Sequence, residues 1–156
     1  MDTSPSKEST QIVLKGSAAV VQGLLVLGET IPIIGQFAVV LQKALEVIKQ
    51  ASQNEDAIVR LHDHAVDISE GLLPHLSGLS SNPGFNDAFN KLITLMKEIE
   101  GSIKDHKKSL LSKVISATDS ALVETVISYI RRLTHCKVLV MDLLIIEMHQ
   151  KIVGRK

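Results

Sequence analysis

Residues 16–41 restrict the fold more than any other part of the sequence, because Glu29 is the only charged side chain in these 26 residues. A secretory signal would begin with basic residues, whereas this chain begins with the polar sequence MDTSPSKESTQ. A transmembrane helix needs about 20 mostly apolar residues, and Gln22 and the break at residues 28–32 divide the run into shorter pieces. We therefore expect the run to be the buried part of a helical fold, with lipid as the alternative destination.

The break at residues 28–32 reads as the end of one helix and the start of another. Gly28 suits a left-handed C-terminal cap, and Pro32 suits a first helical turn, where its missing N–H is not needed. The helix before the break, from about Thr10 to Leu27, has only a narrow polar stripe and is apolar on most of its circumference. Such a helix belongs in the centre of a bundle or in lipid.

The rest of the chain repeats apolar residues at helical spacing. A second helix is predicted over residues 33–51, and a third follows a possible capping box at 52–55 and is kinked or ended by Pro74. After a loop at 77–84, a fourth helix is predicted from about Asn86 to residue 111. Beyond an interruption at 113–119, a last helix of about 30 residues is predicted from Ser120. The three apolar faces predicted for these later helices are Ile58, Leu61, Ala65, Ile68, Leu72 and Leu76; Phe85, Phe89, Leu92, Met96, Ile99 and Ile103; and Leu122, Val126, Tyr129, Leu133, Cys136, Val140 and Leu143.

These patterns predict an all-α fold, an antiparallel bundle of four to five helices with a long C-terminal helix. Aromatic residues make up only 3% of the chain against 45% hydrophobic residues, so the core must be built from Leu, Ile, Val and Ala. We expect residues 10–152 to form a single domain, with a disordered N-terminus over 1–9 and a disordered tail over 153–156.

The net charge is zero, but the charges are unevenly spread. Residues 54–105 hold four basic and nine acidic side chains, and residues 106–156 hold nine basic and four acidic ones. The basic last third suits an anionic surface, and pairing of the two regions within the bundle explains the asymmetry equally well.

Chemistry-bearing residues are few, and we expect no enzyme, cofactor or metal site. His62 and His64 are two positions apart, so they diverge by about 200° on a helix, and we interpret them as surface polar residues. His135 and Cys136 are adjacent and do not face each other. Cys136, the only cysteine, permits no internal disulfide, which favours a cytosolic chain, and we interpret it as a small buried apolar residue.

The order of these features resembles a known family. The apolar first helix, the Ile-Pro-Ile-Ile-Gly turn at 31–35, the segment 54–73 and the segment 109–119 before a long last helix are similar to the fungal HeLo and HeLo-like domains. They also resemble the N-terminal four-helix bundle of the mixed lineage kinase domain-like pseudokinase and its fungal relatives. The resemblance covers about residues 10–148.

What the resemblance implies is a cell-death effector of innate immunity and necroptosis-like programmed cell death. Such a domain is cytoplasmic, receives an upstream signal, is recruited to the plasma membrane, forms a homo-oligomer and permeabilises a membrane of anionic phospholipid. Carried onto this chain, the membrane-inserting candidates are Val20, Val21, Leu24, Leu25, Val26 and Leu27, and the lipid-headgroup candidates are Lys104, Lys107, Lys108, Arg131 and Arg132. Nearby Lys7 and Lys15 are the only basic residues at the first helix, so insertion fits this helix better than headgroup binding.

An alternative role remains open at this point. Some members of the group resemble adaptor domains of signalling receptors, and a soluble helical adaptor would bind itself or a partner protein through a helical face and never enter lipid. We expect no nucleic-acid partner in either case.

Overall fold

The computed structural model describes residues 14–51, 56–76, 83–112 and 120–154. They form five helices: α2 (Ala18–Gly28), α3 (Pro32–Ala51), α4 (Asp56–Leu76), α5 (Pro83–Ser112) and α6 (Ser120–Gly154). Within these ranges 94% of the residues are helical and no residue is in a strand, so the all-α prediction is confirmed.

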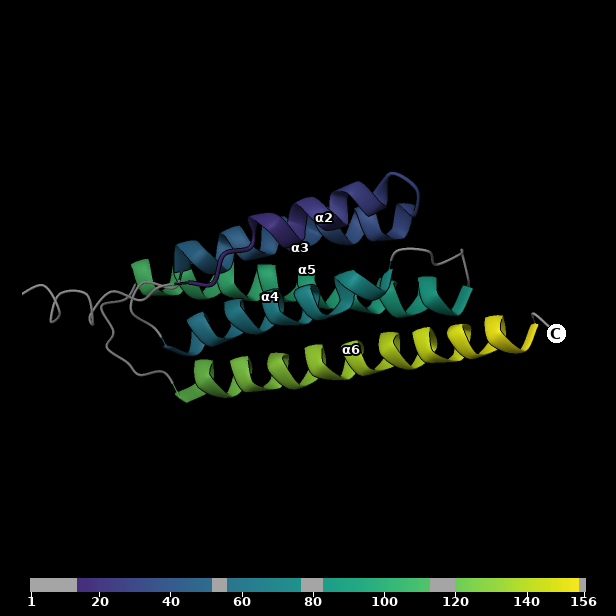
Figure 1. The fold of residues 1–156 in the computed structure, drawn as a ribbon. Coiled ribbons are helices and arrows are strands. Elements are labelled where there is room, and N and C mark those ends of the chain that lie inside the picture. The colour runs from purple at the N-terminus through teal and green to yellow at the C-terminus, as the bar shows by residue number, and fades with distance from the viewer. Residues whose placement is uncertain (1–13, 52–55, 77–82, 113–119, 155–156) are drawn as a thin grey trace, which may run out of the picture.

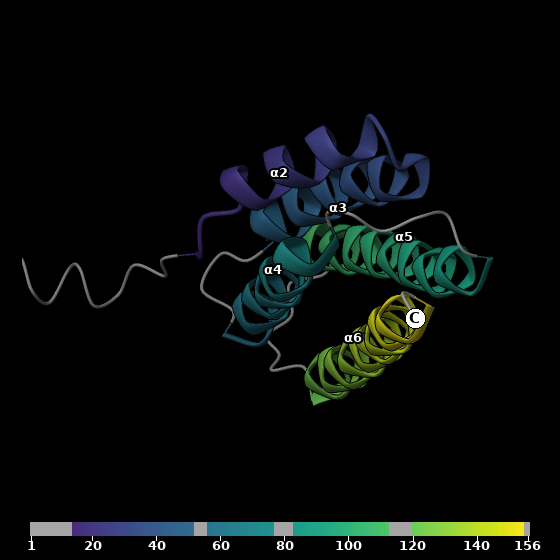
Figure 2. The same cartoon turned by 45° about the vertical axis from the view of Figure 1, so that its right-hand side comes forward.

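Four of the helices enclose the core, and the fifth lies outside them. α3 packs on α4 and α5, and α6 packs on the same two helices, so that α3, α5, α6 and α4 form a ring (Figure 2). α2 contacts only α3 and α4 among the described helices, and it lies on the side of the molecule opposite α6 (Figure 1). Successive helices run in alternating directions along the length of the molecule (Figure 1).

The core is aliphatic with a small aromatic cluster. Phe89 lies at the centre of this cluster, with ring centroids 5.5 Å from Phe37 and 4.7 Å from Phe85. All six residues of the predicted apolar face of α4 and all six of the face of α5 are buried. In α6 the predicted face is buried through Val140, but the next buried residue is Leu144 rather than Leu143. The predicted face alternates steps of three and four residues, which is 3.5 residues per turn, whereas a straight helix has 3.6. Over several turns the predicted positions therefore shift by about one residue relative to the side of the helix that is buried.

The helix boundaries differ from the prediction at several points. α2 begins at Ala18 rather than near Thr10; residues 14–17 are not helical, and residues 10–13 lie outside the described part. α4 continues through Pro74 to Leu76, and α5 begins at Pro83 rather than Asn86. α6 has 35 residues, from Ser120 to Gly154, rather than about 30. The predicted capping box, N-terminal tail and connection at 113–119 fall outside the described residues.

The turn between α2 and α3 confirms one prediction and corrects another. Pro32 is the first residue of α3, as predicted. Gly28, however, is the last helical residue of α2 and is not left-handed, and the following Glu29 has a helical φ of −68°. The reason for a glycine here is close packing: a Cβ on Gly28 would lie 2.3 Å from the Cα atom of Gly35. Two glycines thus let the backbones of α2 and α3 touch.

Candidate interaction surfaces

The predicted membrane-inserting residues lie on α2 and are mostly covered. Val20, Val21 and Leu24 are buried against α3 and α4, and Leu25 and Leu27 are half-buried against the same core. Only Val26 is exposed, at 53%. Insertion of this set into a membrane would therefore require α2 to leave its site on the bundle.

α2 is also short for a membrane segment. Its 11 residues are about 16 Å long at the usual rise per residue, roughly half of the hydrocarbon thickness of a bilayer. Among the residues that the structure describes, no helix combines the length and the apolarity that a membrane crossing needs.

The segment before α2 is held on α4 by a cluster of acidic residues, and this explains the late start of the helix. The backbone N–H of Lys15 donates to the Oδ1 atom of Asp63 at 3.0 Å. The Lys15 ammonium forms an ion pair with Asp67 and lies 3.6 Å from the Oε1 atom of Glu70. The hydrogen bond to Asp67 raises the pKa of Lys15 above its ordinary value. We call Lys15 and these three carboxylates the Lys15 clasp.

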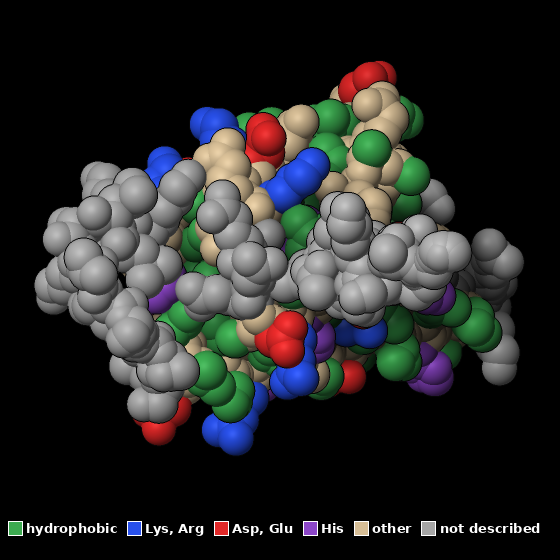
Figure 3. Space-filling model, turned by 90° about the vertical axis from the view of Figure 1, so that its left-hand side faces the viewer, with side chains coloured by type: hydrophobic (Ala, Val, Ile, Leu, Met, Phe, Trp, Pro, Cys, Tyr) green, Lys and Arg blue, Asp and Glu red, His purple; other side chains and the backbone are tan. Residues whose placement is uncertain are grey.

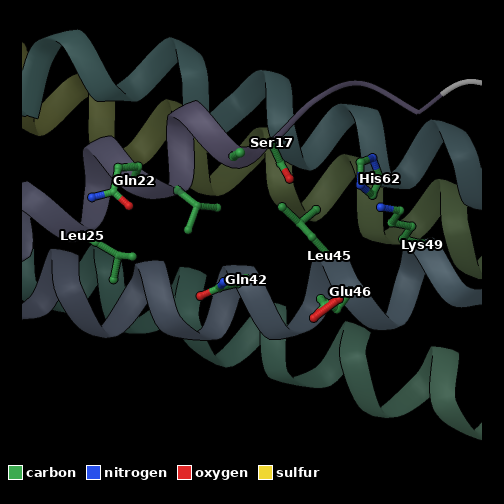
Figure 4. A pocket seen from close by; sticks show the side chains of 10 residues that line it. Ser17, Gln22, Leu25, Gln42, Leu45, Glu46, Lys49 and His62 are labelled. Carbon is green, nitrogen blue, oxygen red and sulfur yellow. The ribbon is translucent and has the colours of Figure 1, made fainter.

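A groove of about 370 Å³ runs between α2 and α3, with His62 of α4 among its lining residues (Figure 4). Polar side chains border it: Ser17 directly before α2, Gln22 on α2, and Gln42 and Glu46 on α3. His62 is buried, at 2% exposure, so the interpretation of it as a surface residue was wrong. The pattern missed it because His62 lies beside Leu61 on the face that packs against the bundle.

His62 and His64 of α4 point to different neighbours, as their spacing predicted. The Nδ1 atom of His62 lies 3.0 Å from the Oδ1 atom of Asp63, and the Nε2 atom of His64 lies 2.9 Å from the Thr134 hydroxyl of α6. Within the described residues, no group of three or more His, Cys, Asp or Glu side chains is placed to hold a metal ion.

Two of the headgroup candidates that the structure describes, Arg132 and Lys104, are paired with carboxylates. Arg132 donates two hydrogen bonds to Glu98, at 2.6 and 2.9 Å, and its guanidinium lies 5.8 Å from the centre of the Tyr129 ring. The same hydrogen bonds lower the pKa of Glu98 and raise that of Arg132. Lys104 pairs with Glu100 at 3.1 Å.

The remaining headgroup candidates are less constrained by the structure. Arg131 is exposed, and the side chains of Lys107 and Lys108 lie outside the described part. Among the side chains coloured in Figure 3, those of Lys and Arg are scattered between acidic, polar and hydrophobic ones. Pairing within the bundle therefore accounts for two of the five candidates, Lys104 and Arg132.

Cys136 is buried in the interface of α6 with α5, which confirms the expectation of a small buried residue. Burial raises the pKa of its thiol, and the nearby Arg132 and Lys91 oppose that shift. A raised pKa reduces the thiolate fraction, and the thiolate is the reactive form. The neighbouring His135 is exposed.

The second half of α6 carries an apolar surface that the sequence analysis missed. Its members are each 48–66% exposed, and we call them the α6 surface: Val138, Ile145, Ile146, Met148, Ile152 and Val153. The signal was present in the run from Val138 to Met148, which has more apolar residues than one buried face of a helix can use. Large exposed apolar patches mark interaction sites in soluble proteins.

Comparisons with protein-family models, with curated proteins and with solved structures gave no significant match.

Proposed function

We propose that this chain is a membrane-permeabilising effector domain of the HeLo-like kind, in which an antiparallel bundle keeps α2 packed until a signal releases it. The observation that carries the proposal is the position of α2 outside the ring of α3, α5, α6 and α4. α2 packs extensively on α3, but the contacts that close this ring are made between the other four helices, so we propose that α2 can leave while these four remain packed together.

Burial explains why the resting protein would hold α2 in place. Burying one large aliphatic side chain contributes roughly 1.5–3 kcal/mol, and Val20, Val21 and Leu24 are all buried. The Lys15 clasp adds a polar attachment at the beginning of this helix. Release therefore needs a trigger that offsets several kcal/mol, in agreement with a domain that stays in the cytoplasm until an upstream protein activates it.

Membrane damage by this route requires more than one copy. A released α2 is too short to cross the hydrocarbon core alone, so we propose that it inserts from one side and that several copies together thin and open the bilayer. The basic headgroup candidates would then exchange their carboxylate partners for lipid phosphates. Each basic side chain near an anionic surface contributes about 1 kcal/mol to the free energy of membrane binding.

A disulfide between α2 and α4 tests the proposal in one protein. A Cβ on Gly23 would lie 2.8 Å from a methyl carbon of Leu73, so Gly23→Cys with Leu73→Cys places two thiols near each other, in a Cys136→Ala background. We expect dye leakage from vesicles of anionic phospholipid to be blocked in the oxidised protein and to return when the disulfide is reduced. The matched control is Cys136→Ala alone, whose leakage reductant should not change.

A second variant distinguishes insertion of α2 from non-specific adsorption of the protein to the membrane. Leu24→Glu with Leu25→Glu places two charges on α2 and should abolish leakage, whereas Val39→Glu, at a 44% exposed position of α3, should leave it unchanged. Circular dichroism establishes that each variant is folded. Equal leakage in the oxidised and reduced disulfide variant, or no leakage by the folded wild type, would contradict the proposal.

The α6 surface favours a second candidate function, a helical adaptor that binds protein and never enters lipid. In that case α2 stays packed at all times and vesicles remain intact. Protein binding would then depend on the α6 surface and would survive the α2–α4 disulfide, which distinguishes the two functions.

A further inference from the structure

The α6 surface lies on the side of the helix opposite the one that packs in the bundle. At 100° per residue, the buried residues from Leu122 to Leu144 centre on one direction, and the α6 surface is centred about 150° away. Neither α4 nor α5, the two helices that contact α6, can therefore cover it. Its residues extend over about four turns, from Val138 to Val153.

The last turns of α6 also extend past the end of the bundle. The Glu98–Arg132 pair sets the register between the antiparallel helices α5 and α6. Counting along both helices from this pair, the first residue of α5, Pro83, lies level with about residue 147 of α6. Residues beyond this point project from the bundle (Figure 1), so a second helix can approach them from any outward direction.

Two exposed ionisable residues lie within the apolar surface. Asp142 and His149 are seven positions apart, so they share one line along the outward face of α6, between Val138 and Val153. A lipid surface covering this face would bury the Asp142 carboxylate with no partner, which is costly. A parallel pair of identical helices would place Asp142 against Asp142. The arrangement of these two residues therefore favours an antiparallel helix that presents a hydrogen-bond donor, such as an imidazole N–H, to Asp142.

We propose that the occupant is a second copy of this chain, paired antiparallel through the α6 surface about a two-fold axis midway between Ile145 and Ile146. In that register, residue n of one copy faces residue 291 − n of the other copy. Ile145 then meets Ile146, Val138 meets Val153, and Asp142 meets His149, with each pair formed twice. A two-fold contact requires such a self-complementary surface.

The arrangement is sterically open, because the two bundles extend in opposite directions from the contact. It leaves α2 uncovered, since α2 lies on the other side of each copy (Figures 1 and 2). The contact between two four-turn segments is at the small end of specific interfaces, below about 1,200 Å². We therefore expect a weak dimer that forms reversibly with concentration. This inference concerns the folded resting chain and does not depend on membrane activity.

Disulfide trapping tests the register. In a Cys136→Ala background, Ile145→Cys should oxidise rapidly to a covalent dimer, because the two copies of position 145 lie beside the axis. Ser128→Cys is the control, because Ser128 is also exposed on α6 but would lie about 50 Å from its counterpart in this register. Equal trapping at both positions would mean random collision and would overturn the proposal.

Sedimentation velocity without lipid tests the contact itself. Ile145→Asp, at a 60% exposed position, should leave the protein folded and monomeric at concentrations where the wild type dimerises. His149→Glu should weaken the dimer about tenfold or more by facing Asp142 with a carboxylate, and the exchange Asp142→His with His149→Asp should restore it. A wild type that stays monomeric at millimolar concentration overturns the proposal, as does a dimer unaffected by Ile145→Asp. Flotation of the monomeric wild type with anionic vesicles, lost in Ile145→Asp, would assign the surface to lipid instead.

Discussion

α2 and the second half of α6 are both apolar over most of their circumference, yet the fold treats them differently. α2 is the shortest of the described helices, and it buries Val20, Val21 and Leu24 against α3 and α4. The last turns of α6 have only one covered side and leave six large apolar side chains in solvent. Hydropathy alone does not separate these two helices. α3 and α4 cover all the large apolar side chains of α2 at least in part except Val26, whereas α4 and α5 cover only one side of α6.

The difference separates two kinds of interaction. A partner of α2 must first displace it from α3 and α4, so any activity of α2 is regulated by the stability of this packing. The surface of α6 is already exposed, so binding of a partner there depends only on the affinity and on the concentration of that partner. The same molecule thus combines a covered apolar helix with an open one on opposite sides (Figure 2).

The largest expected difference is in the free energy of unfolding, between a variant that truncates a buried residue of α2 and one that truncates an exposed residue of α6. Leu24→Ala removes a fully buried side chain and should lower the free energy of unfolding by about 2–5 kcal/mol. Ile152→Ala, at a 66% exposed position, should change it by less than about 0.5 kcal/mol. Urea denaturation at low protein concentration measures both. Similar losses in the two variants would mean that α6 is covered in solution or that α2 is already loose.

Adding one methyl group at the contact of α2 with α3 should have the next largest effect. The Cβ of Gly28→Ala would meet backbone atoms of Gly35, which cannot move aside as a side chain could, so we expect a loss of about 1–3 kcal/mol. Gly101→Ala is the matched control, because Gly101 is exposed on α5 with no atom within 4 Å of the added carbon, and it should gain about 0.5–1 kcal/mol. Thermal unfolding distinguishes the two signs. Stabilisation by both substitutions would show that α2 does not pack tightly at Gly28.

Much of the helical core could be predicted from the sequence, because apolar spacing is a local property. The faces of α4 and α5 follow directly from the alternation of three and four positions, and Pro32 marks the start of α3 by its own geometry. The change from Leu143 to Leu144 in α6 shows the limit of this method, since small errors in period accumulate along a long helix.

The features that were missed depend on tertiary neighbours. Gly28 looked like a helix cap, and only the proximity of Gly35 shows its role in packing. His62 was interpreted as a surface polar residue because its spacing from His64 does not suit a metal site, and only the fold shows that it is buried. The start of α2 was misplaced because the carboxylates that hold Lys15 lie 48 to 55 positions along the chain. The α6 surface was missed because a helical pattern shows which residues are apolar, and does not show how many sides will be covered.

The smallest effect should come from the Lys15 clasp, which separates local opening of α2 from unfolding of the bundle. Lys15→Met removes the ion pairs with Asp67 and Glu70, and we expect a few-fold loss of hydrogen-exchange protection at the amides of α2, with no change in α5. Because the pKa of Lys15 is raised, its contribution is complete below its ordinary value of 10.5 and is lost as the pH rises through the raised pKa. Arginine keeps its charge through this range. Lys15→Arg should therefore protect the α2 amides as wild type does at neutral pH, and should keep that protection where wild type loses it as the pH rises through the raised pKa of Lys15. Equal loss of protection in α2 and α5 would show that α2 opens only when the whole bundle unfolds, and α2 could then not act as a separately released helix.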